Sequence, residues 1–373
     1  MPAPIKKTDT WHGQYDAIID VRSPSEYADD HIPGAINLPV LSDAERVQVG
    51  TLYKQHSPFE ARKIGAAIIS RNIASHLDHQ LNTYPPNWSP LLYCWRGGQR
   101  SGAMAQILSE IGWSVDVLEG GYKSYRRQVQ AELIGITKQL HPVMLDGATG
   151  VGKTIILHAL EANHVQHIDL EGLAAHRGSV LGAIPGLEQP SQRLFESRLY
   201  AALHQLDLNK PIVFEAESSK IGNIHIPDCL WKAMLPAPSI IITADITARV
   251  DYILQDYDHI TTDPSALSKL VNGMIRRHGH DIMMLWASLI AEKNWAELVT
   301  HLMNTHYDPA YLASSKRRQR HKLGEIAMER IDADHATAAA NQIADMITSQ
   351  IVTLTAGLTV PPTSDLIATP IVT

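Results

Sequence analysis

Cys94 opens a glycine- and arginine-rich segment whose residue types suit a reactive thiol. Residues 94–101 read CWRGGQRS and separate an apolar run from an amphipathic stretch. Where a strand passes into a helix, such a loop points successive backbone N–H groups and the helix N-terminus at one place. This environment lowers the pKa of a thiol and binds an oxyanion. The glycines and arginines favour this interpretation over a buried, inert cysteine. The candidate catalytic residues are Cys94, Arg96, Gly97, Gly98 and Arg100.

A second segment has the spacing of a phosphate-binding loop. Residues 147–154 read GATGVGKT, which fits G-x-x-x-x-G-K-[S/T], and they follow an apolar strand-like run and precede a helical one. Backbone N–H groups can close on phosphate oxygens, the lysine neutralises charge, and the threonine can hold Mg²⁺. The pattern does not say which polyphosphate is bound. The residues expected at the phosphate are Gly147, Thr149, Gly150, Gly152, Lys153 and Thr154.

Two pairs of acidic residues follow strand-like runs downstream of this loop. Asp169 and Glu171 come after one run, and Glu215 and Glu217 come after another at 212–214. Either pair can hold a metal ion beside a bound phosphate group. The alternative for each pair is a set of plain surface carboxylates at a strand end.

One dense basic run lies near the C-terminus, although the chain as a whole carries a formal charge of −7. A local cationic face is enough to bind nucleic acid, so the acidic sum does not exclude such a partner. A solvated surface or a flexible segment is the other interpretation. The residues of this run considered for RNA binding are Lys316, Arg317, Arg318, Arg320 and Lys322.

The elements that must position these residues alternate between strands and helices. Short apolar runs at 17–21, 91–93 and 115–118 are separated by helical patterns at 61–77 and 101–111, which predicts a mostly parallel sheet covered on both faces. A second α/β unit begins near the strand at 143–145, and helical patterns predominate from residue 248 onward. We therefore expect an N-terminal domain over 1–130, a second domain with C-terminal helices over 131–350, and a flexible tail over 351–373.

Composition excludes several classes of protein. The 373 residues exceed the size of one typical domain, and two cysteines cannot build a disulfide framework. No run approaches the length of a transmembrane helix, and the first residues carry no secretory signal. The sequence thus predicts a cytoplasmic protein with no membrane partner, and it leaves the oligomeric state undetermined.

Three segments of the first 130 residues resemble the rhodanese domain family. They are DVRSPSEY at 20–27 with HIPGAIN at 31–37, the CWRGG loop at 94–98, and LEGGY at 118–122. The resemblance implies a rhodanese fold in which Asp20 and Arg22 hold the structure together. Arg100 stands six positions after the cysteine, where a sulfur-transferring rhodanese usually has such a residue at five. The longer loop is similar to that of rhodanese-fold phosphatases and should admit a phosphate-sized group.

The order of a rhodanese-like domain and a P-loop NTPase-like domain, with its connecting segments, resembles the tRNA 2-selenouridine synthase family over residues 5–345. The segments include VLSDAER at 40–46, SPFEAR at 57–62, DLEGLAAHRGS at 169–179 and EAES at 215–218. The resemblance implies a transferase that acts on the wobble uridine of tRNA. The 2-thio sulfur is first S-geranylated from geranyl diphosphate, and selenophosphate then supplies selenium. Cys94 is expected to carry selenium as a selenopersulfide-like adduct.

This resemblance implies tRNA, selenophosphate and geranyl diphosphate as substrates, with Mg²⁺ at the diphosphate and no prosthetic group. We expect residues 147–154 to serve the prenyl donor rather than ATP hydrolysis. Two other classes stay open. One is a P-loop kinase or ATPase with an attached rhodanese sulfurtransferase. The other is a regulatory module whose phosphatase-like loop binds phosphoprotein.

Overall fold

The computed structural model describes residues 2–178, 182, 184, 186–215, 218–256, 275–318 and 320–356. The chain forms two compact units that interleave along the sequence. The first unit comprises Met1–Gln139, Leu170–Leu206 and Glu217–Trp231, and the second comprises the remaining segments. The boundary predicted at residue 130 falls inside one helix and stays a prediction.

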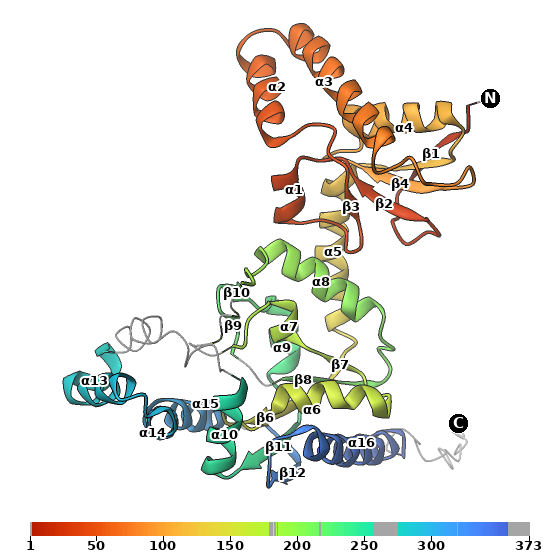
Figure 1. Cartoon of the computed structure of the whole chain (residues 1–373). Helices are drawn as coiled ribbons and strands as arrows, with labels where there is room; N and C mark the ends of the chain where they lie inside the picture. Colours follow the sequence, from red (N-terminus) through yellow and green to blue (C-terminus); the bar gives the residue numbers. More distant parts are fainter. Residues whose placement is uncertain are drawn as a thin grey trace, which may run out of the picture. The chain divides into compact units, whose positions relative to one another are not determined.

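The first unit is built on a five-stranded parallel sheet with strand order β1-β5-β4-β2-β3 (Figure 1). Its central strand β4 is buried along its whole length, which explains the continuous apolar run seen in the sequence. The strands are β1 (Ile5–Thr8), β2 (Ala17–Asp20), β3 (Ile36–Asn37), β4 (Pro90–Tyr93) and β5 (Val115–Leu118).

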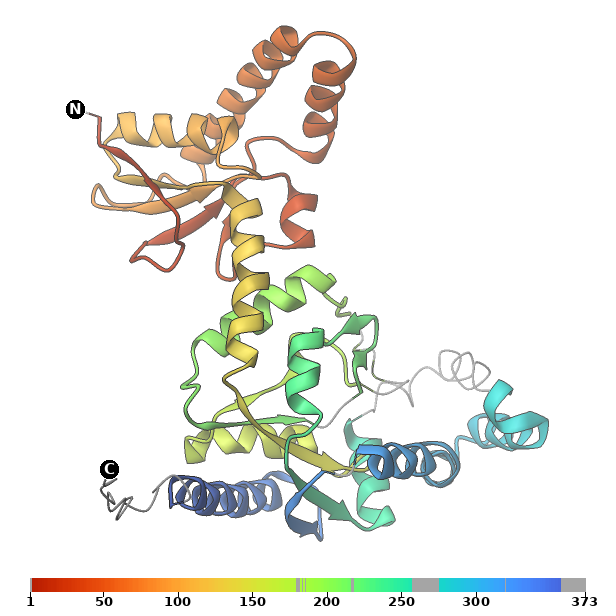
Figure 2. The same ribbon diagram turned by 180° about the vertical axis from the view of Figure 1, so that it is seen from behind.

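Helices of the first unit cover this sheet and supply the loop ends that matter for the site. Helix α4 begins at Gln99, directly after the CWRGG segment, and ends at Ile111, where Gly112 follows in the left-handed conformation. Helices α2 and α3 form an antiparallel pair (Figures 1 and 2). The helices are α1 (Pro24–Asp29), α2 (Asp43–Gln55), α3 (Pro58–Asp78), α4 (Gln99–Ile111), α5 (Gly121–Thr137), α7 (Leu170–Leu173) and α8 (Gln192–His204). A small hairpin of β9 (Lys220–Ile221) and β10 (Ile224–His225) and the start of α9 (Asp228–Met234) complete the unit.

Helix α8 comes from residues near 200 but packs on the N-terminal part of the first unit. The Tyr200 hydroxyl donates a hydrogen bond to Glu132 of α5 at 2.6 Å. Its ring lies 6.3 Å from that of Trp11, which itself makes an edge contact with Tyr125 at 4.7 Å. Arg126 of α5 pairs with a glutamate of α8. The two segments thus share one aromatic and ionic core.

The second unit contains a five-stranded parallel sheet in the order β12-β11-β6-β8-β7. Helices α6 and α16 lie side by side against it and share its apolar core. The strands are β6 (His141–Gly147), β7 (His167–Ile168), β8 (Pro211–Glu215), β11 (Ser239–Ala244) and β12 (Lys322–Met328). The helices are α6 (Lys153–Ala159), η1 (Leu160–Asn163), α10 (Ile246–Asp256), α13 (Ile275–Ala291), α14 (Trp295–Leu302), η2 (Met303–Tyr307), α15 (Asp308–Arg318) and α16 (Ala333–Ala356).

The predicted α/β class, with two parallel sheets and C-terminal helices, is confirmed. The sequence analysis missed strand β12, which completes the second sheet, because charged residues interrupt its apolar pattern. It also missed α8. Part of the predicted tail continues α16 to Ala356. Residues 357–373 lie outside the described residues.

Candidate active site

The Cys94 thiol lies at the carboxyl end of β4, where the chain turns into α4, and only 3% of the residue is exposed. The Ser101 hydroxyl donates a hydrogen bond to Sγ at 3.2 Å, and the Gly98 N–H donates another at 3.3 Å. Burial opposes ionisation of the thiol, but these donors outweigh it and lower the pKa of Cys94. The loop therefore makes this thiol more acidic than an ordinary cysteine, which is the direction that the sequence predicts.

Two glycines from distant segments let the loop close against the start of α5. Gly97 and Gly121 both have positive φ angles, 63° and 55°. A Cβ atom on Gly121 would lie 2.1 Å from the Cys94 carbonyl oxygen, and one on Gly97 would lie 2.5 Å from the Leu118 carbonyl oxygen. Tyr122 N–H donates to the Cys94 carbonyl at 2.8 Å. The loop is thus held by backbone contacts that no larger side chain permits.

A buried ion pair between Arg22 and Asp20 lies close to the residues that hold the loop. Arg22 donates to both carboxylate oxygens of Asp20, at 2.6–3.0 Å, and neither residue is more than 1% exposed. The Arg22 guanidinium also lies 4.0 Å from the centre of the Tyr122 ring. These contacts support the prediction that both residues hold the structure together.

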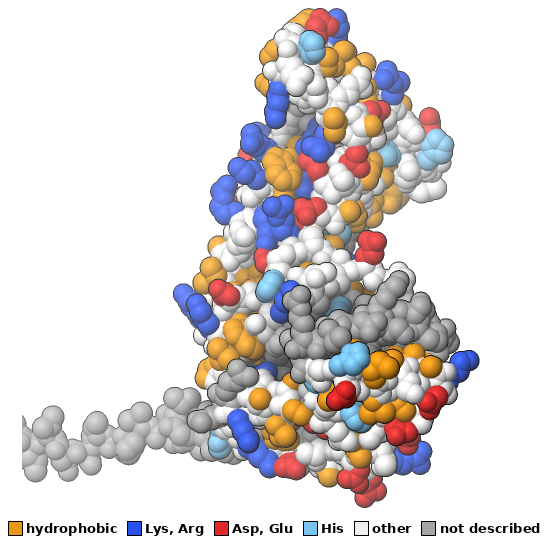
Figure 3. Space-filling model, turned by 90° about the vertical axis from the view of Figure 1, so that its left-hand side faces the viewer, with side chains coloured by type: hydrophobic (Ala, Val, Ile, Leu, Met, Phe, Trp, Pro, Cys, Tyr) orange, Lys and Arg blue, Asp and Glu red, His pale blue; other side chains and the backbone are white. Residues whose placement is uncertain are grey.

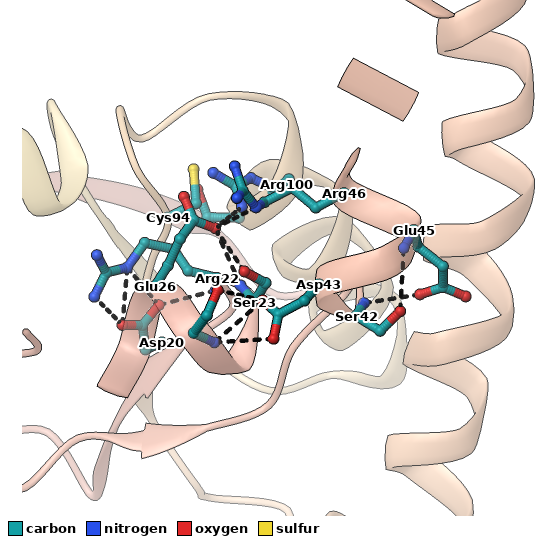
Figure 4. A network of polar contacts seen from close by, with 12 residues as sticks. Asp20, Arg22, Ser23, Glu26, Ser42, Asp43, Glu45, Arg46, Cys94 and Arg100 are labelled. Atoms are coloured by element: carbon teal, nitrogen blue, oxygen red, sulfur yellow. Dashed lines mark hydrogen bonds and ion pairs between the residues drawn. The ribbon is translucent and has the colours of Figure 1, made fainter. Parts of the chain in front are cut away.

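Arg100 is engaged by an acidic residue that the sequence analysis did not connect with it. Glu26 of α1 accepts a hydrogen bond from Arg100 at 2.8 Å, and Arg46 of α2 lies 3.8 Å from the same carboxylate. Burial opposes ionisation of Glu26, but its hydrogen bond with Arg100 leads the effects that lower its pKa. Figure 4 draws this network together with Cys94. Arg46 joins it through tertiary structure alone, so no local pattern could have identified it. Arg96 lies on the loop itself and is exposed.

The phosphate-binding motif forms a loop between β6 and α6 in the second unit. Gly150 and Gly152 have φ angles of 80° and 79°, which glycine adopts at little cost. Lys153 Nζ donates a hydrogen bond at 3.1 Å to the carbonyl of Gly147, the first residue of the motif. Arg249 of α10 donates to the Thr149 carbonyl at 2.9 Å.

The remaining expected phosphate ligand, Thr154, is the second residue of α6 and is half-buried. Arg249, which contacts the loop, is held in turn by two hydrogen bonds to Asp308, at 2.6 and 3.0 Å. Neither residue of this pair is assigned to the phosphate loop from the sequence. The motif gives no signal for them, because they lie about 100 and 150 residues downstream.

The four candidate acidic residues differ in their position relative to the phosphate loop. Glu215 ends β8, is fully buried and pairs in register with Leu145 of β6, the strand that leads into the phosphate loop. Asp169 follows β7, one strand further away, and interacts with His158 at 2.9 Å. Glu171 belongs to α7 of the first unit and is buried. Glu217 lies outside the described residues.

The described residues of the basic run do not all lie on the surface. The Arg320 side chain is only 3% exposed, lies 3.4 Å from the buried Asp146 carboxylate and donates to the Met234 carbonyl. This placement corrects the expectation that Arg320 lies on an RNA-binding surface. Lys322 pairs with Glu325 on β12, and Arg318 donates to Ser314. Lys316 is exposed, and the Arg317 side chain lies outside the described part of the chain.

Within the described ranges, no group of three or more histidine, cysteine, aspartate or glutamate residues has the geometry of a metal site. In the same ranges, no helix is both long and apolar enough to cross a membrane.

The fold and the two loops define a class of protein in which a rhodanese-type cysteine loop and a P-loop unit share one chain. Residues 6–128 match the family described as Rhodanese-like domain, and residues 119–273 match the tRNA 2-selenouridine synthase AAA domain. The chain belongs to the tRNA 2-selenouridine synthase family.

Curated relatives span most of the chain. A tRNA 2-selenouridine synthase of Alcanivorax borkumensis is 32% identical over 81% of this chain and 90% of its own length. The enzyme of that name from Aeromonas salmonicida is 33% identical over 79% and 86%. For the relative from Nitrosomonas europaea, 35% identical over 66% of this chain, the match covers 64% of the relative's length.

Proposed function

We propose that this chain exchanges the sulfur of a 2-thiouridine at the tRNA wobble position for selenium. The observation that carries the proposal is the Cys94 thiol, which lies between a strand and a helix and accepts hydrogen bonds from Ser101 and the Gly98 N–H that lower its pKa. Membership of a family whose curated relatives are named tRNA 2-selenouridine synthases supports the reaction class. The P-loop of the second unit offers a separate site for a diphosphate.

In the first reaction, the sulfur of 2-thiouridine attacks the first carbon of geranyl diphosphate. The S–C bond forms, the C–O bond breaks, diphosphate leaves, and the proton on N3 of the uridine is released. Residues 147–154 suit the diphosphate because Lys153 and the loop N–H groups neutralise the charge that builds on the leaving group. The alkylated sulfur is then a better leaving group from C2 of the uridine, so the two reactions belong together.

Mg²⁺ fits the donor set near this loop. It prefers oxygen ligands, and the Thr154 hydroxyl and the Glu215 carboxylate at the end of the neighbouring strand are of that kind. When bound, the ion supplies positive charge for a departing diphosphate. Glu215 comes from the strand beside β6, whereas Asp169 is one strand further away, so we assign Glu215 first.

In the second reaction, electron counting favours attack by Cys94 on the phosphorus of selenophosphate. Attack on selenium would leave phosphorus as phosphite, which is two electrons more reduced than phosphate. Attack on phosphorus forms an S–P bond, breaks the Se–P bond and releases hydrogen selenide without any redox partner. The selenide adds to C2 of the alkylated uridine, and geranyl thiol leaves with one proton. Water then cleaves the S–P bond and restores Cys94. This route replaces the selenopersulfide expected from the family resemblance.

The test is mass analysis of wobble nucleosides from cells that lack the gene, complemented with the wild-type chain or with Cys94→Ser. We expect 2-selenouridine only with the wild type. Unchanged 2-selenouridine in the deletion would refute the proposed function. Intact mass analysis of the protein after brief exposure to selenophosphate separates the two routes. A phosphoryl mass on Cys94 supports attack on phosphorus, and a selenium mass refutes it.

A further inference from the structure

Three exposed cations lie on the Cys94 loop and on helix α5, whose first turn contacts that loop. Arg96 lies in the loop, and Lys123 and Arg127 lie on consecutive turns of α5, four residues apart and therefore on one face. All three side chains are exposed. Among the residues that the structure describes, none of the three has an acidic partner.

A backbone contact places Lys123 next to the loop that carries the thiol. Lys123 N–H donates to the carbonyl of Trp95 at 3.1 Å, one residue after Cys94. Trp95 is half-buried, and its ring lies 5.1 Å from that of Tyr122. The loop and the first turn of α5 therefore present one surface that combines positive charge with an aromatic ring.

Three acidic groups near the loop already have cationic partners. Glu196 pairs with Arg126, which lies one turn after Lys123 on α5, and Glu26 pairs with Arg100. Glu119, just before α5, lies 4.0 Å from Lys7. The net charge beside the loop is thus positive, and Figure 3 shows Lys and Arg side chains gathered on one side of this part of the molecule, in its upper half.

The basic run near the C-terminus offers less free charge. Arg320 is buried against Asp146, and Lys322 is paired with Glu325. Salt-dependent RNA affinity arises from cations that are free to neutralise phosphates. Among the described side chains, the surface at the cysteine loop has three exposed cations without an acidic partner, whereas the basic run adds the exposed Lys316.

We propose that Arg96, Lys123 and Arg127 bind the phosphate backbone of the tRNA anticodon arm, with Trp95 offering a stacking face for an unpaired base. This inference rests on the proposed function and names the surface of the chain that receives the RNA. A wobble base must leave its stack to meet an enzyme group, and proteins commonly stack such bases on aromatic rings. The three cations would then position the anticodon loop of the RNA so that the wobble base lies over Cys94.

The experiment measures binding of a labelled anticodon stem-loop RNA with 2-thiouridine at the wobble position to the full-length chain, by fluorescence anisotropy over a series of salt concentrations. The variant is Lys123→Glu with Arg127→Glu. We expect affinity to fall at least about ten-fold and the slope of log K against log salt to decrease by roughly 1.5–2. Lys54→Glu, on exposed α2, is the matched control and should bind as the wild type does.

Thermal unfolding establishes that the charge-reversed variant is folded, and the neutral pair Lys123→Gln with Arg127→Gln should show an intermediate loss. Wild-type affinity and slope in both double variants would overturn the proposal. So would an equal loss with Lys54→Glu, or a loss confined to Lys316→Glu with Lys322→Glu. These outcomes leave RNA binding by the wild type intact. Absence of binding by the wild type would overturn the proposed function as well.

Discussion

Replacing Ser101 by alanine removes the hydroxyl that donates to the Cys94 sulfur at 3.2 Å, while the Gly98 N–H stays in place. Ser101 is fully buried in the first turn of α4 and Cys94 is only 3% exposed. The substitution removes one oxygen atom and adds no bulk. Its effect on the thiol is therefore electrostatic rather than steric.

The size of the effect follows from the charge of the thiolate. A hydrogen bond to a charged group contributes about 1.5–3 kcal/mol, and burial prevents water from replacing it. Since about 1.4 kcal/mol corresponds to a factor of ten in an equilibrium, the alanine variant should hold at least about ten-fold less thiolate at a pH below the wild-type midpoint. The direction is a higher pKa for Cys94, because the hydroxyl now lowers it.

The assay is the pH profile of the alkylation rate of Cys94 by iodoacetamide. Cys229 is the one other cysteine and is replaced by serine in every sample. The wild-type rate should reach its plateau at lower pH than the rate of Ser101→Ala. Gln99→Ala, an exposed position on the same helical turn, serves as the control and should follow the wild type. Coincident profiles for wild type and Ser101→Ala would refute the account of how the loop activates the thiol.

Three further substitutions test other parts of the structure. Gly121→Ala puts a Cβ atom 2.1 Å from the Cys94 carbonyl oxygen, so we expect a lower unfolding temperature and slower Cys94 alkylation; a normal rate would contradict the backbone packing. Arg320→Ala leaves the buried Asp146 carboxylate without its ion pair and should cost about 3–5 kcal/mol in urea unfolding; a loss below about 1 kcal/mol would show that the pair is dispensable. Lys153→Ala should weaken binding of geranyl diphosphate in calorimetry; full geranylation with loss of ATP binding alone would remove the prenyl donor from the P-loop.

The parts of the site that could be predicted are those encoded in short continuous segments. The cysteine loop and the phosphate loop each need a strand, a glycine-rich turn and a helix, and these follow one another in the sequence. The strands β4 and β6 could be predicted because the buried part of a parallel strand is a nearly continuous apolar run, here 91–93 and 143–145.

The parts that could not be predicted depend on contacts between distant segments. Arg46 and Glu26 meet through the packing of α1 and α2, and Arg249 meets Asp308 across the second unit. For the basic run, the sequence predicted an exposed surface that the structure does not show at Arg320. Its charge was visible, but the burial of Arg320 depends on Asp146, 174 residues earlier in the chain.

The return of α8 to the N-terminal part of the first unit limits how this protein can be divided. A fragment that ends at residue 139 would lose Tyr200, an aromatic neighbour of Trp11, and would lose Glu196, one of the acidic partners of Arg126. We therefore expect that the part of the chain that carries Cys94 does not fold independently of α8. Function should survive a gene fusion, a truncation or recombination between relatives only when the segment around α8 and the N-terminal sheet come from the same chain.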